Sequence, residues 1–375
     1  MEDEINVRTL TSFDTIFPAD TVEWCPVEPY LHILACGTYE LIEDEKKSET
    51  KSTQSRRGQI LLFRITNGGG LEKLQEICTS GVLDMKWLHV KDVEARILLA
   101  VVDSIGYLQV YQLKDDGKKV ELKFITKLKV SDDEDVMALS LDWSREKYTV
   151  SDAVTNTNIL VSDSAGQISQ FTWRETGDLT KDFTWPAHEF QAWIVAYDYC
   201  TPSIFYSGGD DHKFLCFDVR TGSHPVVKSK EHTAGVTSIH SNVSKSSLLA
   251  TGSYDEGVRL WDKRNFKQPM SKISLNGGVW RLKWDSFTRR YLFAACMQSG
   301  FNIINHDIMP SVVVNYKEHK GLAYGCDWSF LKQPDVSRLN IRDGDTLIST
   351  CSFDHCLKIS VIDFWPDRHD VDQTY

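Results

Sequence analysis

Short runs in which apolar and polar residues alternate dominate the chain, and helical periodicity is nearly absent. Residues 207–218 and 251–262 show the pattern best: small residues, an acidic turn, then an alternating run that ends in an aromatic residue and Asp. Such runs, bounded by Gly, Asp and Asn, predict antiparallel β-strands joined by tight turns. The two segments begin 44 residues apart, so the pattern is a repeat.

The repeat can be followed along almost the whole chain. Four further copies lie at residues 101–111, 161–171, 296–305 and 351–360. A seventh copy is split into residues 34–39 and 58–63 by a charged, Ser/Thr-rich insertion at residues 40–57. A second short apolar run precedes each copy, and a period of 40 to 50 residues is typical of four-stranded sheets repeated around an axis.

The ending in Trp-Asp at residues 261–262, with a His ahead of three of the hairpins, is similar to the pattern of WD-repeat proteins. The resemblance implies an all-β fold, a seven-bladed WD-repeat β-propeller. We expect one domain over residues 1–375, with a loop insertion at 40–57 and a C-terminal tail at 364–375. Residues 5–17 are rich in β-formers and are expected to supply the outer strand that closes the last blade.

His and Asp residues recur at one phase of the repeat. Three pairs share this phase: His188 with Asp211, His232 with Asp255, and His319 with Asp354. A His/Asp pair resembles part of a catalytic triad, but its repetition favours a buried hydrogen-bond network within each blade. The second and sixth copies have Ile105 and Ser299 at the Asp position, so packing alone is expected to hold those blades.

Charge and the ends of the sequence limit the partners and the compartment. The 53 acidic residues outnumber the 42 basic ones, giving a net charge of -11, which argues against nucleic acid as a partner. Met1–Glu4 is acidic where a secretory signal would be basic, and no apolar run is long enough to span a bilayer. We therefore expect no membrane association and a cytosolic or nuclear location, and we assign the protein to the cytoplasm.

No sequence motif indicates a cofactor or a metal. The chain has no GxSxG elbow, no HExxH zinc helix and no GxxxxGK[ST] phosphate loop. Its nine cysteines include no CxxC pair, so reduced core thiols are expected. The alternative is a catalytic cysteine or a zinc site, for which Cys351, His355 and Cys356 form the best cluster.

One face of the propeller is expected to collect aromatic and acidic side chains. In the repeat, the loops before the first strand and between the second and third strands emerge on the same side. The residues in these loops include Asp20, Tyr39, His188, Glu189, Trp193, Asp210, Tyr254, Glu256, Trp280, Arg281 and Tyr324. Aromatic rings with nearby carboxylates suit a quaternary ammonium group. The alternative is a surface that binds a protein partner.

Several blocks exceed what the repeat requires. They are residues 20–26, 34–39, 83–87, 138–143, 206–211, 250–256, 277–281 and 294–297. In these blocks the chain resembles the diphthine methyl ester hydrolases, a family also called diphthine methyltransferases. The resemblance implies hydrolysis of the methyl ester on the modified histidine of translation elongation factor two, a step of diphthamide biosynthesis. The trimethylammonium group of that side chain agrees with the aromatic face.

The resemblance leaves the catalytic roles open. For the base we consider Asp210, Glu189 and Glu256; Arg281 is a candidate oxyanion or carboxylate contact, and His232 is a further candidate. Trp193, Tyr254, Trp280 and Tyr324 are the expected substrate-binding residues. A solvated-surface role remains the alternative for each catalytic candidate. Hydrolysis needs only a positioned water, a base and an oxyanion donor, so we expect no cofactor.

Two other functions compete with the enzyme. Residues 261–264 read Trp-Asp-Lys-Arg and residues 217–220 read Phe-Asp-Val-Arg. A Trp-Asp-x-Arg ending is found in substrate receptors of cullin ubiquitin ligases, so an adaptor of such a ligase is an alternative partner. A non-catalytic scaffold is the third interpretation. In each case we expect a monomer.

Overall fold

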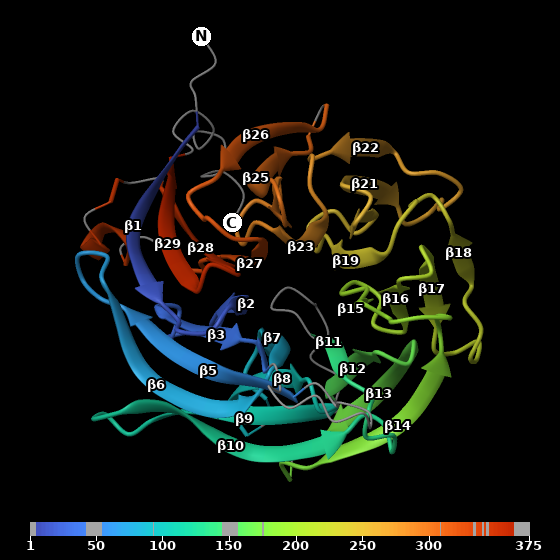
Figure 1. Cartoon of the computed structure of the whole chain (residues 1–375), viewed down its shortest axis with the longest axis horizontal. Coiled ribbons are helices and arrows are strands. Elements are labelled where there is room, and N and C mark those ends of the chain that lie inside the picture. The colour runs from blue at the N-terminus through green and yellow to red at the C-terminus, as the bar shows by residue number, and fades with distance from the viewer. Residues whose placement is uncertain are drawn as a thin grey trace.

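Seven antiparallel sheets surround a central axis in the computed structural model (Figure 1). The structure describes residues 5–42, 55–92, 94–144, 157–174, 176–307, 309–332, 335–339, 341–342 and 345–363. Within these residues the helical structure is one 3-10 turn, η1 (Val336–Leu339). The predicted seven-bladed, all-β propeller is therefore confirmed.

Each blade has its first strand at the axis, and later strands lie progressively further out. The first blade consists of β2 (Ala19–Trp24), β3 (Ile33–Thr38), β5 (Ser55–Ile65) and β6 (Leu71–Ser80). The second consists of β7 (Val82–Trp87), β8 (Ile97–Asp103), β9 (Tyr107–Asp115) and β10 (Val120–Lys129). The third consists of β11 (Ala138–Trp143), β12 (Thr157–Asp163), β13 (Gln167–Trp173) and β14 (Leu179–Pro186). The fourth and fifth are β15 (Ile194–Tyr197), β16 (Ile204–Gly208), β17 (Phe214–Asp218) and β18 (Val227–Ser229); and β19 (Val236–Ser241), β20 (Leu248–Ser253), β21 (Gly257–Asp262) and β22 (Ser271–Ser274). The sixth is β23 (Val279–Trp284), β24 (Tyr291–Cys296), β25 (Gly300–Asn305) and β26 (Ser311–Tyr316), and the seventh is β27 (Ala323–Trp328), β28 (Thr346–Ser352), β29 (Cys356–Asp363) and β1 (Asn6–Asp14).

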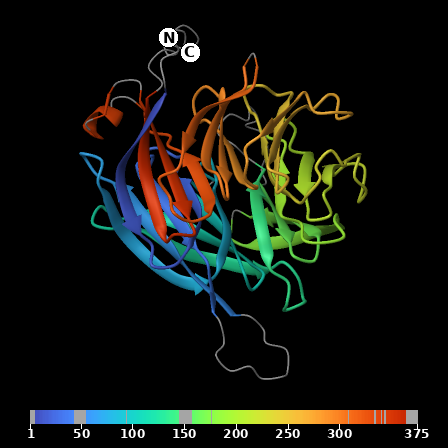
Figure 2. The ribbon, with the colours of Figure 1, turned by 45° about the horizontal axis from the view of Figure 1, so that its top comes forward.

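The seventh blade joins the two ends of the propeller. Strand β1 pairs antiparallel with β29, from Asn6 opposite Asp363 to Asp14 opposite Cys356. Figures 1 and 2 both show β1, in dark blue, lying along the red β29. The predicted closing strand at residues 5–17 is confirmed.

The charged insertion is shorter than the sequence pattern indicates. Glu40–Ile42 forms a strand, β4, that pairs with the start of β5, with Glu40 opposite Arg57. The two ends of the expected loop at 40–57 are thus a hairpin extension of the first blade, because alternating side chains continue past the turn position. Residues 43–54 and the tail at 364–375 lie outside the described residues.

The three His/Asp pairs form hydrogen-bond networks inside their blades. His232 pairs with Asp255 (Nδ1 to Oδ2, 3.1 Å) and Thr251 (Nε2 to Oγ1, 2.8 Å), and Trp261 Nε1 donates to the same hydroxyl at 2.9 Å. His188 pairs likewise with Asp211 at 2.8 Å, and His319 with Asp354 at 3.2 Å. The structural role predicted for these pairs is therefore confirmed.

The second blade has a polar network of its own, so the expectation that packing alone holds it is wrong. Asp103 accepts hydrogen bonds from the backbone N–H groups of Ile105 and Tyr107. Its other oxygen accepts from Gln109 Nε2 at 2.6 Å. The carboxylate stands two residues earlier than in the blades with a His/Asp pair, at the end of β8 instead of within the turn.

Tryptophans at the ends of inner strands join neighbouring blades. Trp87 Nε1 donates to the Glu23 carbonyl at 3.1 Å, and Trp143 Nε1 donates to the Lys86 carbonyl at 2.9 Å. Trp284 and Trp328 repeat the contact in the sixth and seventh blades. These residues are almost fully buried, so each seam combines an apolar core with a hydrogen bond between blades.

Replacing Asp255 by Ala is expected to lower the free energy of unfolding by about 3 kcal/mol. The change leaves His232 Nδ1 without its acceptor and Arg259, which contacts Asp255 at 2.9 Å, as an unbalanced buried cation. Burial raises the pKa of Asp255, but hydrogen bonds from His232 and Arg259 lower it further, to below the usual range. A lowered carboxyl pKa stabilises the fold above about pH 4 and that stabilisation is lost in acid. Denaturant unfolding should show a reduced acid dependence in the variant.

The neighbouring exposed residue provides the control for this variant. Glu256→Gln changes a carboxylate in the same turn without touching His232 or Arg259, so it should unfold like the parent chain. Equal unfolding curves for Asp255→Ala and Glu256→Gln would contradict the structural role.

No helix within the described residues is long and apolar enough to cross a membrane.

Candidate functional site

Bulges interrupt most of the inner strands near the mouth of the central channel. The pairing between first and second strands skips one residue in six of the seven blades. The skipped residues are Asp20, Leu83, Leu139, Thr237, Trp280 and Tyr324. In the fourth blade Trp193 stands immediately before β15. A bulged residue leaves the alternation of its strand and is re-aimed, which gathers this set at one end of the axis.

Four rings meet at the mouth, and we call them the aromatic cluster: Trp193, Tyr254, Trp280 and Tyr324. The Trp193 centroid lies 5.7 Å from that of Trp280 and 6.1 Å from that of Tyr254. The Trp280 and Tyr324 centroids are 5.6 Å apart. The rings come from four blades, and each is partly exposed. The four residues that the sequence predicts for substrate binding are thus brought together.

Asp210 lies at one side of the aromatic cluster. Trp193 Nε1 donates a hydrogen bond to Asp210 Oδ1 at 3.2 Å. Burial, followed by the charge of Asp210, raises the pKa of Tyr254 above its usual range, so this carboxylate also acts on a second ring. The arrangement offers aromatic faces beside a fixed negative charge, which is favourable for a cation.

Asp20 lies on the other side of the mouth and was assigned no role from the sequence. Its side chain is only 7% exposed, and no hydrogen-bond donor reaches Oδ2. Burial and the nearby Asp84 raise its pKa to about 7, although Arg281 opposes the shift. The charge of Asp20 contributes, after burial, to the raised pKa of Tyr324, about 12. Asp20 stands at the same position of the repeat as Trp280 and Tyr324. This equivalence is the sequence feature that could have identified it as a site residue.

Arg281 lies in the channel below the mouth. Its guanidinium contacts Asp84 Oδ1 at 3.2 Å, with both side chains buried. Asp84 also accepts hydrogen bonds from Ser140 Oγ at 2.9 Å and from the backbone of Leu141. The predicted oxyanion or carboxylate contact therefore has a carboxylate partner within the protein.

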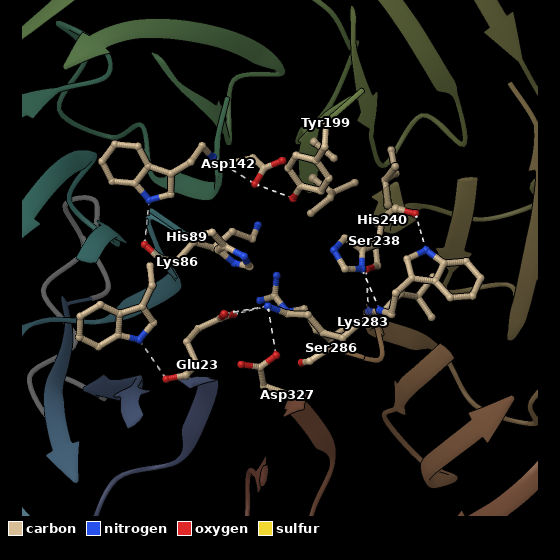
Figure 3. Close-up of a pocket in the computed structure, with 18 of the residues that line it drawn as sticks. Glu23, Lys86, His89, Asp142, Tyr199, Ser238, His240, Lys283, Ser286 and Asp327 are labelled. Carbon is tan, nitrogen blue, oxygen red and sulfur yellow. Dashed lines mark hydrogen bonds and ion pairs between the residues drawn. The ribbon is translucent and has the colours of Figure 1, made fainter. Parts of the chain in front are cut away.

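Charged residues also line a small cavity in the channel. Lys283 contacts Glu23 at 2.7 Å and Asp327 at 3.7 Å. Figure 3 shows these acidic groups converging on one amine, with His240, Asp142 and Tyr199 around the cavity. Burial raises the pKa of Glu23 to about 7, and this network links inner strands of the first, sixth and seventh blades.

The remaining catalytic candidates are either exposed or part of the hydrogen-bond network of a blade. Glu189 is exposed and accepts a hydrogen bond from Lys213 at 2.5 Å. Glu256 is exposed in the β20–β21 turn. His232 is 3% exposed and serves the network of its blade. A role for these three as base stays a prediction.

The side chains that could hold a zinc ion differ from the cluster of Cys351, His355 and Cys356 expected from the sequence. Among the described residues, the three groups whose ligand atoms lie within 4.8 Å of one another are His319, Asp354 and Cys356. Two of them form the blade network. Cys351 is fully buried in β28, where its pKa is raised well above the usual range by burial and by Cys36.

The two Asp-x-Arg turns lie on the face opposite the aromatic cluster, where third strands end. Arg264 donates from Nη2 and Nε to Asp262, and Arg220 does the same to Asp218. Both arginine side chains are largely exposed. A ligase-adaptor role for this face stays a prediction.

The chain is similar to curated proteins named diphthine methyltransferase. The protein of that name from Homo sapiens is 40% identical over 341 residues, covering 86% of this chain and 75% of the relative. The diphthine methyltransferase homolog of Dictyostelium discoideum is 35% identical, covering 92% and 96%. The Schizosaccharomyces pombe diphthine methyltransferase is 29% identical, covering 90% and 93%. No protein-family model matches.

A structural likeness concerns the fold alone. A chain in a crystal structure of the mitotic checkpoint complex superposes with a TM-score of 0.69 at 16% identity, covering 96% of this chain and 93% of that one. Sequence similarity over most of the length of both proteins is the stronger finding. The chain belongs to the diphthine methyltransferase family.

Proposed function

We propose that this chain is a carboxylic ester hydrolase that removes the methyl ester from methylated diphthine on translation elongation factor two. Family membership supports a role in diphthamide biosynthesis. The observation that carries the proposal is the aromatic cluster with Asp210 beside it at the mouth of the channel.

The fold favours hydrolysis over methyl transfer, in spite of the names of the relatives. A methyl donor such as S-adenosylmethionine usually sits on a Gly-rich loop between a strand and a helix of a parallel sheet. The described residues form antiparallel blades with no strand–loop–helix unit of that kind. Ester hydrolysis requires a positioned water, a base and a donor for the oxyanion, all of which polar side chains of propeller loops can supply.

The aromatic cluster is the proposed site for the trimethylammonium group of the substrate. This group cannot donate hydrogen bonds, so π faces and a nearby carboxylate are the contacts open to it. Trp193 and Tyr254 stand at a T-shaped angle, 86°, and Asp210 is fixed against Trp193. The quaternary ammonium would thus be held at a set distance from the ester carbon.

Apolar side chains around the mouth support a protein substrate. The exposed apolar residues are Ile16, Ile105, Phe190 and Phe353, in connections on the side of the aromatic cluster, and Leu41 in β4; they are 39% to 61% exposed. The Phe353 ring contacts Tyr324, with centroids 6.3 Å apart. Exposed apolar groups around a concave mouth are typical of a surface that docks another protein.

Incubation of the purified chain with elongation factor two carrying methylated diphthine, without a methyl donor, should remove the methyl group. In water enriched in oxygen-18, the label should enter the diphthine carboxylate, because attack by water at the ester carbon breaks the acyl–oxygen bond. Mass spectrometry of the modified peptide gives both readings. Methylation of diphthine that depends on an added donor would contradict the proposal.

A further inference from the structure

We propose that Asp20 is the general base of this site, and that it activates the water that attacks the ester. The inference rests on the proposed function and names a residue for its central step. Three features of the structure carry it: the place of Asp20 at the mouth, its burial, and the lack of a partner at Oδ2.

The place of Asp20 follows from the bulge in β2. Pairing with β3 runs from Ala19 directly to Thr21, so Asp20 is the skipped residue. Trp280 and Tyr324 occupy the same position in the two blades that precede the first blade around the ring. Asp20 therefore belongs to the same layer as the aromatic cluster.

The lack of a partner at Oδ2 sets Asp20 apart from the other buried carboxylates of the channel. Asp84 contacts Arg281 and Ser140, and Glu23 contacts Lys283 at 2.7 Å. Asp142 accepts from the backbone of Tyr197 at 2.7 Å and from Tyr199. A buried acceptor without a donor is costly, and its retention requires an explanation such as a ligand that supplies the donor.

The surroundings give Asp20 the protonation behaviour of a base that works at neutral pH. The charged and titratable groups that face it come from four strands and one turn: Arg281 in β23, Asp84 in β7, Tyr324 in β27, Cys351 in β28 and Tyr254 in the turn after β20. Burial and Asp84 raise the pKa to about 7, and Arg281 limits the rise. Such a carboxylate can take a proton from water and return it later.

The proposed step conserves atoms and charge. The water oxygen forms a bond to the ester carbonyl carbon while its proton passes to Asp20. The resulting tetrahedral intermediate collapses, the bond from carbon to the methoxy oxygen breaks, and the proton on Asp20 passes to that oxygen. The products are methanol and the carboxylic acid, which loses its proton to solvent.

A donor without a partner stands in the same layer. Trp280 Nε1 is buried and has no hydrogen-bond acceptor in the described residues. Within the proposal this N–H donates to the carbonyl oxygen as negative charge develops there. Trp280→Phe keeps an aromatic face and removes the N–H, so it should reduce kcat about tenfold or more with little change in KM.

Asp20→Asn is the direct test, because it keeps the shape and removes the base. We expect kcat to fall about a hundredfold or more, KM to stay within about twofold, and the pH dependence of kcat to lose its inflection near pH 7. Asp210→Asn is the matched variant and should show the opposite pattern, a raised KM with the inflection retained. A melting curve of each variant checks the fold.

The outcomes separate this inference from the proposed function. If the parent chain does not hydrolyse the ester, the proposed function fails. If the parent is active and a folded Asp20→Asn variant keeps its turnover and its inflection, Asp20 is not the base and the proposed function stands. Should Asp20→Asn unfold, Asp20→Glu keeps the carboxylate; retained turnover with a displaced inflection supports the base, and an undisplaced inflection overturns it.

Discussion

Deletion of residues 1–14 is expected to lower the melting temperature by about 5 °C or more and to promote self-association. The deletion removes β1, which pairs with β29 over its whole length. It also removes Leu10 and Phe13 from one seam of the core and Val7 from another. Each partly buried apolar side chain contributes about 1 kcal/mol, and an exposed β29 edge is a template for pairing with a second chain.

Two comparisons sharpen this test. A deletion of residues 1–4 alone leaves β1 intact and should melt like the full chain. Phe13→Ala removes only the ring that lies 4.8 Å from Phe63 and should give a smaller decrease than the strand deletion. Melting is followed by circular dichroism and association by light scattering. A 1–14 deletion that stays monomeric with an unchanged melting temperature would show that β1 does not close the ring.

Replacement of both Trp193 and Trp280 by Ala should lower kcat/KM for the methylated elongation factor about a hundredfold or more, with a raised KM from the lost rings. Each cation–π contact contributes about 0.5 to 2 kcal/mol to binding of the cation. Each single variant should therefore lose several-fold to about thirtyfold in kcat/KM. The centroids of the two rings lie 5.7 Å apart, so both rings can contact the same cation. The effects of the two substitutions on kcat/KM are therefore not expected to be additive. Steady-state kinetics of the two single variants and the double variant measure the coupling.

A competition experiment distinguishes a cation site from general packing. Tetramethylammonium should inhibit the parent chain, and it should not inhibit the double variant. Trp193→Phe retains an aromatic face but loses the hydrogen bond to Asp210, so it should keep most of the affinity. Inhibition of parent and double variant to the same extent would contradict the cation site.

The repeat explains why much of the site could be predicted without a structure. Trp193, Trp280 and Tyr324 stand at one phase of their copies, and a propeller brings equal phases to equal height around its axis. The His/Asp networks follow for the same reason, as each joins residues within one hairpin unit. The spacing within the repeat therefore predicts both the aromatic residues of the mouth and the His/Asp networks.

Contacts between distant copies could not be predicted in this way. Arg281 and Asp84 are almost two hundred residues apart, and their 3.2 Å contact depends on how the inner strands converge. Asp20 was placed on the correct face from its phase, but the residue type alone does not show that Oδ2 is buried without a donor. The strand pairing of Glu40 with Arg57 could not be predicted either, because both residues lie in a segment whose charged composition is typical of a loop.

The skipped position in each inner strand separates the chemistry of the mouth from the integrity of the blades. Ladder hydrogen bonds on both sides of Asp20, Trp280 or Tyr324 close without these residues, so their side chains can change while the register is kept. These equivalent positions thus carry an acid, an indole and a phenol on a constant frame. Exchanging residues at these positions alone is a route to propellers that accept other modified side chains.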